Sequence, residues 1–281
     1  MMNKFLGIIG YPLGHSISPV FQQAALDALG IDARYEGWET ASENLAKRVE
    51  SFRSDGFVGS SVTIPHKESV MPFLDEISEA ARKIGSVNTI VSRGGKLTGH
   101  NTDAPGFLRG LREHGKLEPR GKDVVLVGTG GAGRAVAFGL AGEGAASIML
   151  VNRTAVRAER LGEEVSRAYP DVEVSVEGEI PSGHEYDLLV NGTSVGMRHT
   201  PAENSSPVPR DRIVPGALVY DLIYNPEETV LLKLAKEAGA RTLGGLPMLV
   251  FQGAKAFELW FGREAPVEAM FRAAREAMAN R

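Results

Sequence analysis

Residues 124–133 read Val-Val-Leu-Val-Gly-Thr-Gly-Gly-Ala-Gly, and this stretch decides the fold. The β-branched run Asp123–Val127 predicts a strand, and the run Gly133–Gly142 predicts a helix that begins near Gly131. The glycines between them fit the pattern G-x-G-x-x-G. Such a turn from a strand into a helix binds the pyrophosphate of a dinucleotide, because the helix N-terminus presents free N–H groups. We predict this site, with a purely structural turn as the alternative.

Each residue of the glycine turn has a predicted role at the dinucleotide. Gly128 permits the tight turn, Gly130 lets the backbone touch the pyrophosphate, and Gly133 allows close packing of the helix on the strand. Gly131 and Ala132 open the helix, so they belong with the predicted cofactor-binding residues.

The residues after the next predicted strand, Ser147–Val151, indicate which dinucleotide binds. NAD sites usually carry an acidic residue about 20 positions after the glycine motif, at the ribose 2′-hydroxyl. This chain has Asn152-Arg153-Thr154 there, with Arg157 one turn later and no carboxylate. An arginine can hold a 2′-phosphate with its planar fork of donors. We predict NADP, bound by Asn152, Arg153, Thr154 and Arg157; the alternative is that both arginines are solvated residues at a helix start.

Short apolar runs alternate with longer amphipathic stretches along the chain, which favours the α/β class, with parallel sheets covered by helices. The predicted strands are Phe5–Ile9, Arg34–Trp38, Phe57–Thr63, Thr89–Ser92, Lys96–Gly99, Asp123–Val127, Ser147–Val151, Val172–Val176, Asp187–Val190 and Ala217–Asp221. The predicted helices are Ser18–Leu29, Glu43–Ser54, one at the domain joint near Asn101–Gly106 that reaches Arg112, Gly133–Gly142, Ala155–Ala168, Glu228–Ala238 and most of residues 246–280. Two α/β patterns in succession predict two domains. One is a substrate domain with a mostly parallel sheet, residues 1–103 and 246–281, and the other a Rossmann-like NADP-binding domain, residues 104–245.

Composition and charge exclude several classes of function. A net charge of −4 gives no reason to expect a nucleic acid or an anionic membrane as partner. The absence of cysteine excludes disulfides, thiolate nucleophiles and cysteine metal sites. No stretch reaches the ~20 apolar residues that span a bilayer, and no signal peptide is expected, so we predict a cytoplasmic protein. The six histidines show no paired ligand spacing, which disfavours a metal hydrolase.

Three polar regions of the N-terminal domain lie where a predicted strand meets a helix. They are Gly14-His15-Ser16-Ile17-Ser18-Pro19, then Ser61-Val62-Thr63-Ile64-Pro65-His66-Lys67, and the pair Gly85–Thr89 and Gly99–Asp103. Ser16 and Ser18 alternate, so both hydroxyls can face a ligand. Ser18 also suits the N-cap of the following helix, and this alternative stays open.

Lys67 and Asp103 are the candidate acid–base pair. Reduction of a ketone needs a hydride from a nicotinamide and a proton for the developing alkoxide. A lysine just past a buried strand can lie in a cleft and lose its hydration, and Asp103 lies at the predicted domain joint. Spacing alone leaves the alternative that both side chains are solvated. We predict an oxidoreductase that interconverts a ketone and an alcohol on a small polar substrate.

Nine motifs together resemble the shikimate dehydrogenase family, in family order and over nearly the whole chain. The motifs are Gly14–Pro19, Val62–Lys67, Val87-Asn88-Thr89, Gly99–Asp103, Gly128–Gly133, Asn152-Arg153-Thr154, Asn191–Met197, Asp221–Pro226 and Gly245–Gly253. The resemblance implies the NADP-dependent, reversible reduction of 3-dehydroshikimate to shikimate, a step of the shikimate pathway of aromatic amino-acid biosynthesis.

The resemblance also implies a role for each matching residue. Lys67 and Asp103 would be the catalytic pair, with Lys67 as the proton donor. The residues implied to bind substrate are Ser16 and Ser18 at the carboxylate, Tyr224 beside them, and Thr63, Asn88, Asp103 and Gln252 at the ring hydroxyls. The further residues implied to bind cofactor are Thr193, Met197, Leu222 and Gly245, of which Met197 and Leu222 would border the nicotinamide. Serine at both 16 and 18 favours shikimate over quinate.

Two other interpretations stay open. The nearer one is a broader quinate/shikimate dehydrogenase that uses NAD, although the absence of an acid at Asn152 speaks against NAD. The other is a non-catalytic NADP-sensing regulator, which would bind the cofactor and turn nothing over. We expect a small-molecule substrate, no metal, and a monomer or a homodimer.

Overall fold

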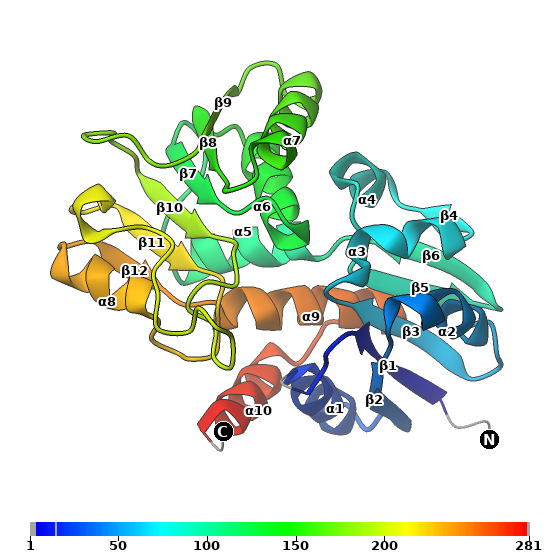
Figure 1. Ribbon diagram of the computed structural model, residues 1–281. Helices are drawn as coiled ribbons and strands as arrows, with labels where there is room; N and C mark the ends of the chain where they lie inside the picture. The colour runs from blue at the N-terminus through cyan, green and yellow to red at the C-terminus, as the bar shows by residue number, and fades with distance from the viewer. Residues whose placement is uncertain (1–3, 15, 280–281) are drawn as a thin grey trace. The chain divides into compact units, whose positions relative to one another are not determined.

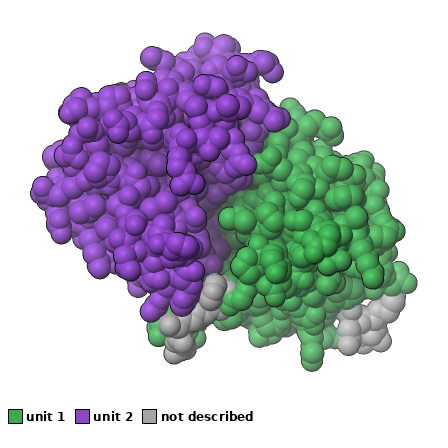
Figure 2. Space-filling model, viewed as in Figure 1, with its two compact units in different colours: residues 1–106, 250–281 green, residues 107–249 purple. Residues whose placement is uncertain are grey.

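The chain divides into two compact units in the computed structural model, which describes residues 4–14 and 16–279. Residues 1–106 and 250–281 make up the first unit, and residues 107–249 make up the second (Figure 2). Both boundaries fall inside helices, in α5 (Asp103–Glu113) and in α9 (Leu246–Phe261).

The first unit holds a six-stranded sheet in the order β2-β1-β3-β5-β6-β4 (Figure 1). Its strands are β1 (Lys4–Gly10), β2 (Ala33–Glu39), β3 (Phe57–Val62), β4 (Glu76–Ile77), β5 (Thr89–Arg93) and β6 (Lys96–His100). β1 is parallel to both β2 and β3, whereas β5 runs antiparallel to β3 and β6. The pair β5–β6 forms a hairpin, and its turn residues Gly94 and Gly95 both have positive φ, as a tight hairpin turn requires.

Helices pack against this sheet through aromatic and aliphatic side chains. The helices of this unit are α1 (Ser18–Ala28), α2 (Leu45–Ser51), α3 (His66–Ser69), α4 (Glu79–Ile84), the part of α9 that belongs to this unit, and α10 (Val267–Ala279), which packs on α1. Phe52 and Phe57 stack with ring centroids 4.3 Å apart inside one apolar cluster. The Trp260 indole Nε1 of α9 donates to the Ile90 carbonyl at 2.9 Å. A Cβ on Gly59 would lie 2.1 Å from that nitrogen, so the approach of α9 requires glycine there.

The second unit holds a six-stranded parallel sheet in the order β12-β11-β10-β7-β8-β9. Its strands are β7 (Asp123–Val127), β8 (Ser147–Val151), β9 (Glu173–Glu177), β10 (Leu188–Asn191), β11 (Leu218–Asp221) and β12 (Arg241–Leu243). Counted from β7, this is the 3-2-1-4-5-6 strand order of the Rossmann fold. The order reverses between β7 and β10, and ligands of such sheets bind at the carboxyl ends of the strands on either side of that point.

Alternate residues of these strands face opposite layers. The helices of the unit are α6 (Gly131–Gly142), α7 (Ala155–Ala168), α8 (Val230–Glu237) and the portions of α5 and α9 that belong to it. Tyr220 of β11 stacks on Phe107 of α5 with ring centroids 5.1 Å apart. Its neighbour Val219 joins a different cluster, with Leu231 of α8. Because both faces are covered, the central strands β7, β8, β10 and β11 are apolar at nearly every position, which is why the sequence revealed them as short continuous runs.

Every predicted strand forms, with ends shifted by at most one residue, but two short strands and two short α-helices were not predicted. The missed elements are β4, β12, α3 and α4, which contain 2, 3, 4 and 6 residues. Elements of this length are too short for a period of two or of 3.6 residues to repeat.

Residues 246–279 are helical, as predicted, with a break between α9 and α10. Gly262 lies at this break with a φ of 63°, a left-handed conformation that ends helices. Within the part of the chain that the structure describes, α9 included, no helix is long and apolar enough to cross a membrane.

Candidate active site

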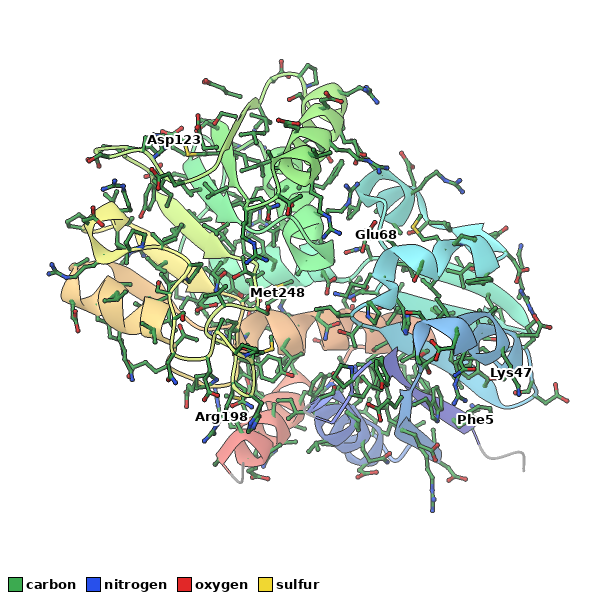
Figure 3. All side chains as sticks on the ribbon, viewed as in Figure 1. Phe5, Lys47, Glu68, Asp123, Arg198 and Met248 are labelled. Atoms are coloured by element: carbon green, nitrogen blue, oxygen red, sulfur yellow. The ribbon has the colours of Figure 1, made fainter. Side chains whose placement is uncertain are left out.

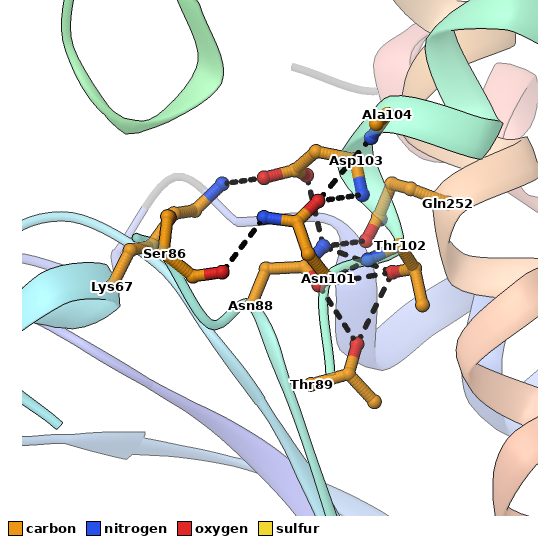
Figure 4. A network of polar contacts seen from close by, with 9 residues as sticks. All are labelled: Lys67, Ser86, Asn88, Thr89, Asn101, Thr102, Asp103, Ala104 and Gln252. Atoms are coloured by element: carbon orange, nitrogen blue, oxygen red, sulfur yellow. Dashed lines mark hydrogen bonds and ion pairs between the residues drawn. The ribbon is translucent and has the colours of Figure 1, made fainter. Parts of the chain in front are cut away.

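Lys67 and Asp103 form a close ion pair in the first unit (Figure 4). Lys67 lies on α3, just past β3 and next to Glu68 (Figure 3), and Asp103 is the first residue of α5. Lys67 Nζ lies 2.5 Å from Asp103 Oδ2. The two side chains are only 14% and 6% exposed, so water and salt screen the pair weakly. The structure therefore brings together the two residues that the sequence paired across 36 positions.

Asn88 holds the other oxygen of the Asp103 carboxylate. Its Nδ2 donates to Asp103 Oδ1 at 2.9 Å and to Gln252 Oε1 of α9 at 3.3 Å. Its Oδ1 accepts from the Thr102 backbone N–H at 2.7 Å and from the Thr89 hydroxyl at 3.1 Å. Because a backbone N–H can only donate, the Asn88 amide is fixed with its oxygen toward Thr102 and its nitrogen toward Asp103. Both oxygens of the carboxylate are thus occupied as acceptors.

A second amide, that of Asn101, fixes the start of α5. Its Oδ1 accepts from the backbone N–H groups of Asp103 at 3.1 Å and Ala104 at 3.3 Å. Its Nδ2 donates to the Ser86 carbonyl at 3.0 Å. These bonds satisfy first-turn N–H groups as helix caps do, and they tie the backbone of Asp103 to the loop before Asn88 (Figure 4).

Sequence reasoning assigned no individual role to Asn101, Thr102 or Thr89. An asparagine two residues before a predicted helix was the available signal for Asn101, because asparagine is a favoured capping residue. Thr102 contributes a hydroxyl that accepts from Asn88 Nδ2 at 2.9 Å and a backbone N–H, which no residue type reveals.

The remaining residues implied at the substrate lie in three segments. Ser18 is buried and is the first residue of α1, with no side-chain cap, so the alternative that Ser18 caps this helix is wrong. The hydroxyl that accepts a first-turn N–H is that of Ser16, 3.3 Å from the Ser18 nitrogen. Thr63 directly follows β3 and is half-buried. Tyr224 belongs to the second unit, and His15, part of the predicted serine segment, lies outside the described residues.

The glycine turn of the second unit follows β7, at the point where the strand order reverses. Gly128 has a φ of 96°, and a Cβ there would lie 2.6 Å from Thr193 Cγ2. Gly133 lies in the first turn of α6, where a Cβ would be 2.1 Å from the Gly128 carbonyl oxygen. Contacts within the protein therefore account for both glycines.

Gly130 differs because no contact within the protein requires it. Its φ of −72° is open to any residue, and a Cβ there would meet no heavy atom within 4 Å. It is the N-cap of α6, so the open space adjoins the helix end, where N–H groups and the helix dipole favour an anion. The neighbouring Thr129 hydroxyl is buried and has no hydrogen-bond partner among the described residues. The pyrophosphate of a dinucleotide fits this turn.

The segment after β8 carries the side chains predicted at the 2′-phosphate. Asn152 Nδ2 donates to the Thr154 carbonyl at 2.8 Å, which closes a tight turn before α7. Arg153 and Arg157 are both exposed. Residues 152–157 contain two arginines and no acid, so the local charge suits a phosphate better than a bare hydroxyl.

Two loops beside the glycine turn carry the other predicted cofactor residues. Residues 192–197, here called the first loop, follow β10 and include Thr193 and Met197. Residues 222–226, the second loop, follow β11 and include Leu222. Gly245 packs on the second loop, since a Cβ there would lie 2.1 Å from the Leu222 carbonyl oxygen.

A cavity of about 530 Å³ lies in the second unit, near the amino ends of the sheet strands and away from the glycine turn. Its lining includes Arg120, Lys122, Asp187 and Arg241. Arg120 and Arg241 are exposed, and Lys122 is paired with Asp187 at 3.0 Å. Rossmann sheets bind their ligands at the opposite, carboxyl ends, so we place the cofactor site at the glycine turn.

Three family profiles match this chain, and a curated relative matches nearly all of it. The Shikimate dehydrogenase substrate binding domain matches residues 8–90, the Shikimate / quinate 5-dehydrogenase profile residues 112–205, and the Shikimate 5'-dehydrogenase C-terminal domain residues 245–275. A shikimate dehydrogenase (NADP(+)) of Moorella thermoacetica is 43% identical over 97% of this chain and 93% of its own length. The chain belongs to the shikimate dehydrogenase family.

Solved structures of shikimate dehydrogenase relatives share the fold of the whole chain. The enzyme of Thermus thermophilus in complex with NADP(H) and shikimate matches with a TM-score of 0.88 and 38% identity, covering 98% of this chain and 99% of that one. A quinate dehydrogenase of Corynebacterium glutamicum in complex with NAD matches with a TM-score of 0.88 and 33% identity, with the same coverage. Relatives with this fold thus carry either nucleotide, so the residues after β8, rather than the fold, bear on the choice of cofactor.

Proposed function

We propose that this member of the shikimate dehydrogenase family catalyses the NADP-dependent, reversible reduction of 3-dehydroshikimate to shikimate. The buried Lys67–Asp103 pair carries the proposal, because it places a proton donor beside a fixed acceptor. The open space at Gly130 supports a dinucleotide, and the exposed Arg153 and Arg157 support NADP. The relative named as an NADP(+) shikimate dehydrogenase supports both substrate and cofactor.

We assign the two ligands to different parts of the chain. Residues 1–103 and 246–281 form the proposed substrate and catalytic domain, and residues 104–245 form the proposed NADP-binding Rossmann domain. The compact units divide after residues 106 and 249, a few positions further along α5 and α9. A Rossmann strand order in the second unit supports the assignment of the cofactor to it.

Lys67 moves the proton of the reaction. When bound, the reduced nicotinamide supplies a hydride to the carbonyl carbon of the substrate. The Lys67 ammonium donates a proton to the oxygen of that carbonyl, and in the oxidation direction its neutral amine takes the proton from the hydroxyl. An ammonium group has three N–H donors. One is held by Asp103, which aims the group and leaves two for the substrate.

Fixed polar groups recognise the hydroxyls of the substrate ring. The Asn88 amide cannot turn over without losing its bond from the Thr102 backbone, so it presents its donor and acceptor in one arrangement. The residues proposed to bind substrate are Ser16, Ser18, Thr63, Lys67, Asn88, Asp103, Tyr224 and Gln252. A site of this kind rejects analogues that lack a hydroxyl, because its buried polar groups would be left unpaired.

The cofactor is held by the glycine turn, the segment after β8 and the two loops. The residues proposed to bind NADP are Gly128, Gly130, Gly131, Ala132, Gly133, Asn152, Arg153, Thr154, Arg157, Thr193, Met197, Leu222 and Gly245. The turn binds the pyrophosphate through backbone N–H groups, and the arginines bind the 2′-phosphate through charge-assisted hydrogen bonds.

The test of this function is the absorbance of the reduced nicotinamide, with each of NADP and NAD paired with each of shikimate and quinate. We expect rapid reduction of NADP by shikimate and slow reduction in the other three mixtures. Comparable rates with quinate or NAD would instead assign the chain to a broader quinate/shikimate activity. No turnover by folded protein that still binds NADP would overturn the enzyme assignment in favour of a regulator.

We further propose that the enzyme acts in the cytoplasm as a monomer or a homodimer. Biosynthetic use of NADPH and the absence of cysteine support this location. Sedimentation at several protein concentrations distinguishes the two assembly states, because only a reversible dimer changes its apparent mass on dilution.

A further inference from the structure

Asp221 is a buried carboxylate to which the proposed reaction gives no role. It ends β11 and has no exposed surface. Its oxygens accept hydrogen bonds from three neutral donors: Asn191 Nδ2 at 3.0 Å, the Ile223 backbone N–H at 3.1 Å and the Thr229 hydroxyl at 2.6 Å. Burial outweighs these bonds and raises the pKa of Asp221 from 3.8 to about 6. Because burial of a carboxylate costs free energy, we expect Asp221 to have a role other than packing.

We infer that Asp221 is a positioning residue: it sets the conformation of the first and second cofactor loops without touching the cofactor. The inference rests on the proposed function, because the loops matter only if they line a bound NADP. Its geometry follows from the sheet. Asn191 and Asp221 are register partners on β10 and β11, and one loop leaves the sheet from each of them.

The connection to the first loop runs through the amide of Asn191. An ionised Asp221 can only accept, so Asn191 directs Nδ2 to it and Oδ1 toward Thr193. That Oδ1 accepts from the Thr193 backbone N–H at 3.0 Å and from its hydroxyl at 2.7 Å. Thr193 Oγ1 in turn accepts from the Val195 N–H at 3.1 Å. Because Thr193 packs against Gly128, this chain of hydrogen bonds sets the loop against the glycine turn.

The connection to the second loop is direct. Asp221 Oδ1 accepts from the Ile223 N–H, which fixes the peptide between Leu222 and Ile223. The same short segment is held from its other side, where the Gly245 N–H donates to the Ile223 carbonyl at 3.0 Å. Asp221 Oδ2 binds the Thr229 hydroxyl, whose oxygen caps α8. One carboxylate therefore joins both loops and the helix that follows them.

The test compares Asp221→Ala and Asp221→Asn with Tyr186→Phe as a matched control. Asparagine keeps an acceptor for both Asn191 and Ile223, so it is the conservative variant. Tyr186 is buried in the same unit, and its hydroxyl donates to the Arg212 carbonyl at 2.8 Å and accepts from the Val214 N–H at 3.2 Å. These bonds lie beside the cavity near the amino ends of the strands, so Tyr186→Phe removes buried hydrogen bonds without affecting either loop.

For Asp221→Ala we expect about tenfold or larger increases in the KM for NADP and in the Kd for NADPH, measured by nicotinamide fluorescence. The KM for shikimate should rise less, because Tyr224 is the single proposed substrate residue on the second loop. Asp221→Asn should restore most of the NADP affinity. Tyr186→Phe should lower the melting temperature and leave both KM values unchanged. An Asp221→Ala enzyme that loses stability as Tyr186→Phe does, with an unchanged KM for NADP, would overturn the inference.

Two further arms keep the test decisive. If Asp221→Ala does not fold, Thr193→Val breaks the same chain of hydrogen bonds at its half-buried end, and it should weaken NADPH binding more than Thr193→Ser does. Equal NADPH binding by these two variants would contradict the inference. If the native protein binds NADPH but oxidises no shikimate, the proposed function fails, while weaker NADPH binding by Asp221→Ala still supports the positioning role.

Discussion

At the scale of single residues, the charged side chains of the two sites differ in how they are held. Lys67 is largely buried and bound to one partner, Asp103, which is itself fixed by Asn88. Arg153 is exposed at the tip of a turn. A buried, fixed cation suits proton transfer at one position, whereas an exposed guanidinium suits the capture of a phosphate that arrives from solution. The consequence for Arg153 is a selective effect on one cofactor.

Arg153→Ala should raise the KM for NADP by about tenfold or more and leave the KM for NAD nearly unchanged, because only NADP carries the 2′-phosphate. Initial rates with each cofactor at saturating shikimate measure the effect. Arg160→Ala is the matched control: Arg160 lies on the same helix, α7, is 79% exposed and pairs with Glu164. Equal changes for NADP and NAD in Arg153→Ala would rule out the 2′-phosphate contact.

At the scale of elements, the strand–turn–helix unit of β7 and α6 requires glycine for two different reasons: packing of the helix on the strand, and space for a ligand at the helix N-terminus. Gly128 and Gly133 serve the packing of the helix on the strand, as their short distances to neighbouring atoms indicate. No atom of the described residues requires glycine at position 130, where a Cβ would enter the open space at the N-terminus of α6. The sequence pattern already predicted different roles for the three glycines, and the structure adds the neighbouring atoms that require glycine at positions 128 and 133.

Gly130→Ala should therefore weaken NADP binding without changing stability, whereas Gly133→Ala should lower stability. Gly130→Ala meets no atom of the protein, so its unfolding midpoint should match the native one, while NADP binding weakens by about tenfold because the methyl group displaces a phosphate. Gly133→Ala would press against the Gly128 carbonyl and should lower the free energy of unfolding by about 1–3 kcal/mol. Thermal unfolding without cofactor and calorimetric titration with NADP measure the two effects.

The reverse outcome would contradict this account of the turn. A Gly130→Ala protein with native NADP affinity would mean that the pyrophosphate does not approach Gly130. A Gly133→Ala protein with native stability would mean that α6 moves away from the turn at little cost.

At the scale of the whole molecule, the sequence predicted long elements and missed short ones. Every strand buried between layers was evident as an apolar run, for example Ser147–Val151, because a strand covered on both faces needs apolar side chains on both faces. β4 and β12 were missed because two or three residues show no period. The helix Glu43–Ser54 was predicted too long: its first turn is a 3-10 helix, Ser42–Asn44, and α2 ends at Ser51.

For the site, the sequence indicated which residues take part, but not how their side chains are oriented. Residue type and position made Lys67 and Asp103 a candidate pair, but spacing alone left the alternative that both side chains are solvated, and the family resemblance implied their roles. The orientation of the Asn88 amide was not predictable, because it depends on the backbone N–H of Thr102, which every non-proline residue has. The role inferred for Asp221 was also not predictable from the sequence, because it depends on the three segments that its hydrogen bonds join.

The central claim is that Lys67 transfers the proton when shikimate is oxidised with NADP, and Lys67→Ala tests it most directly. We expect kcat to fall by about 10²–10⁴, while the Kd for shikimate changes only a few-fold because the other polar groups still hold the ring. Lys96→Ala, an exposed lysine of the same unit paired with Glu76, should keep native kinetics. Near-native turnover by Lys67→Ala would contradict the account.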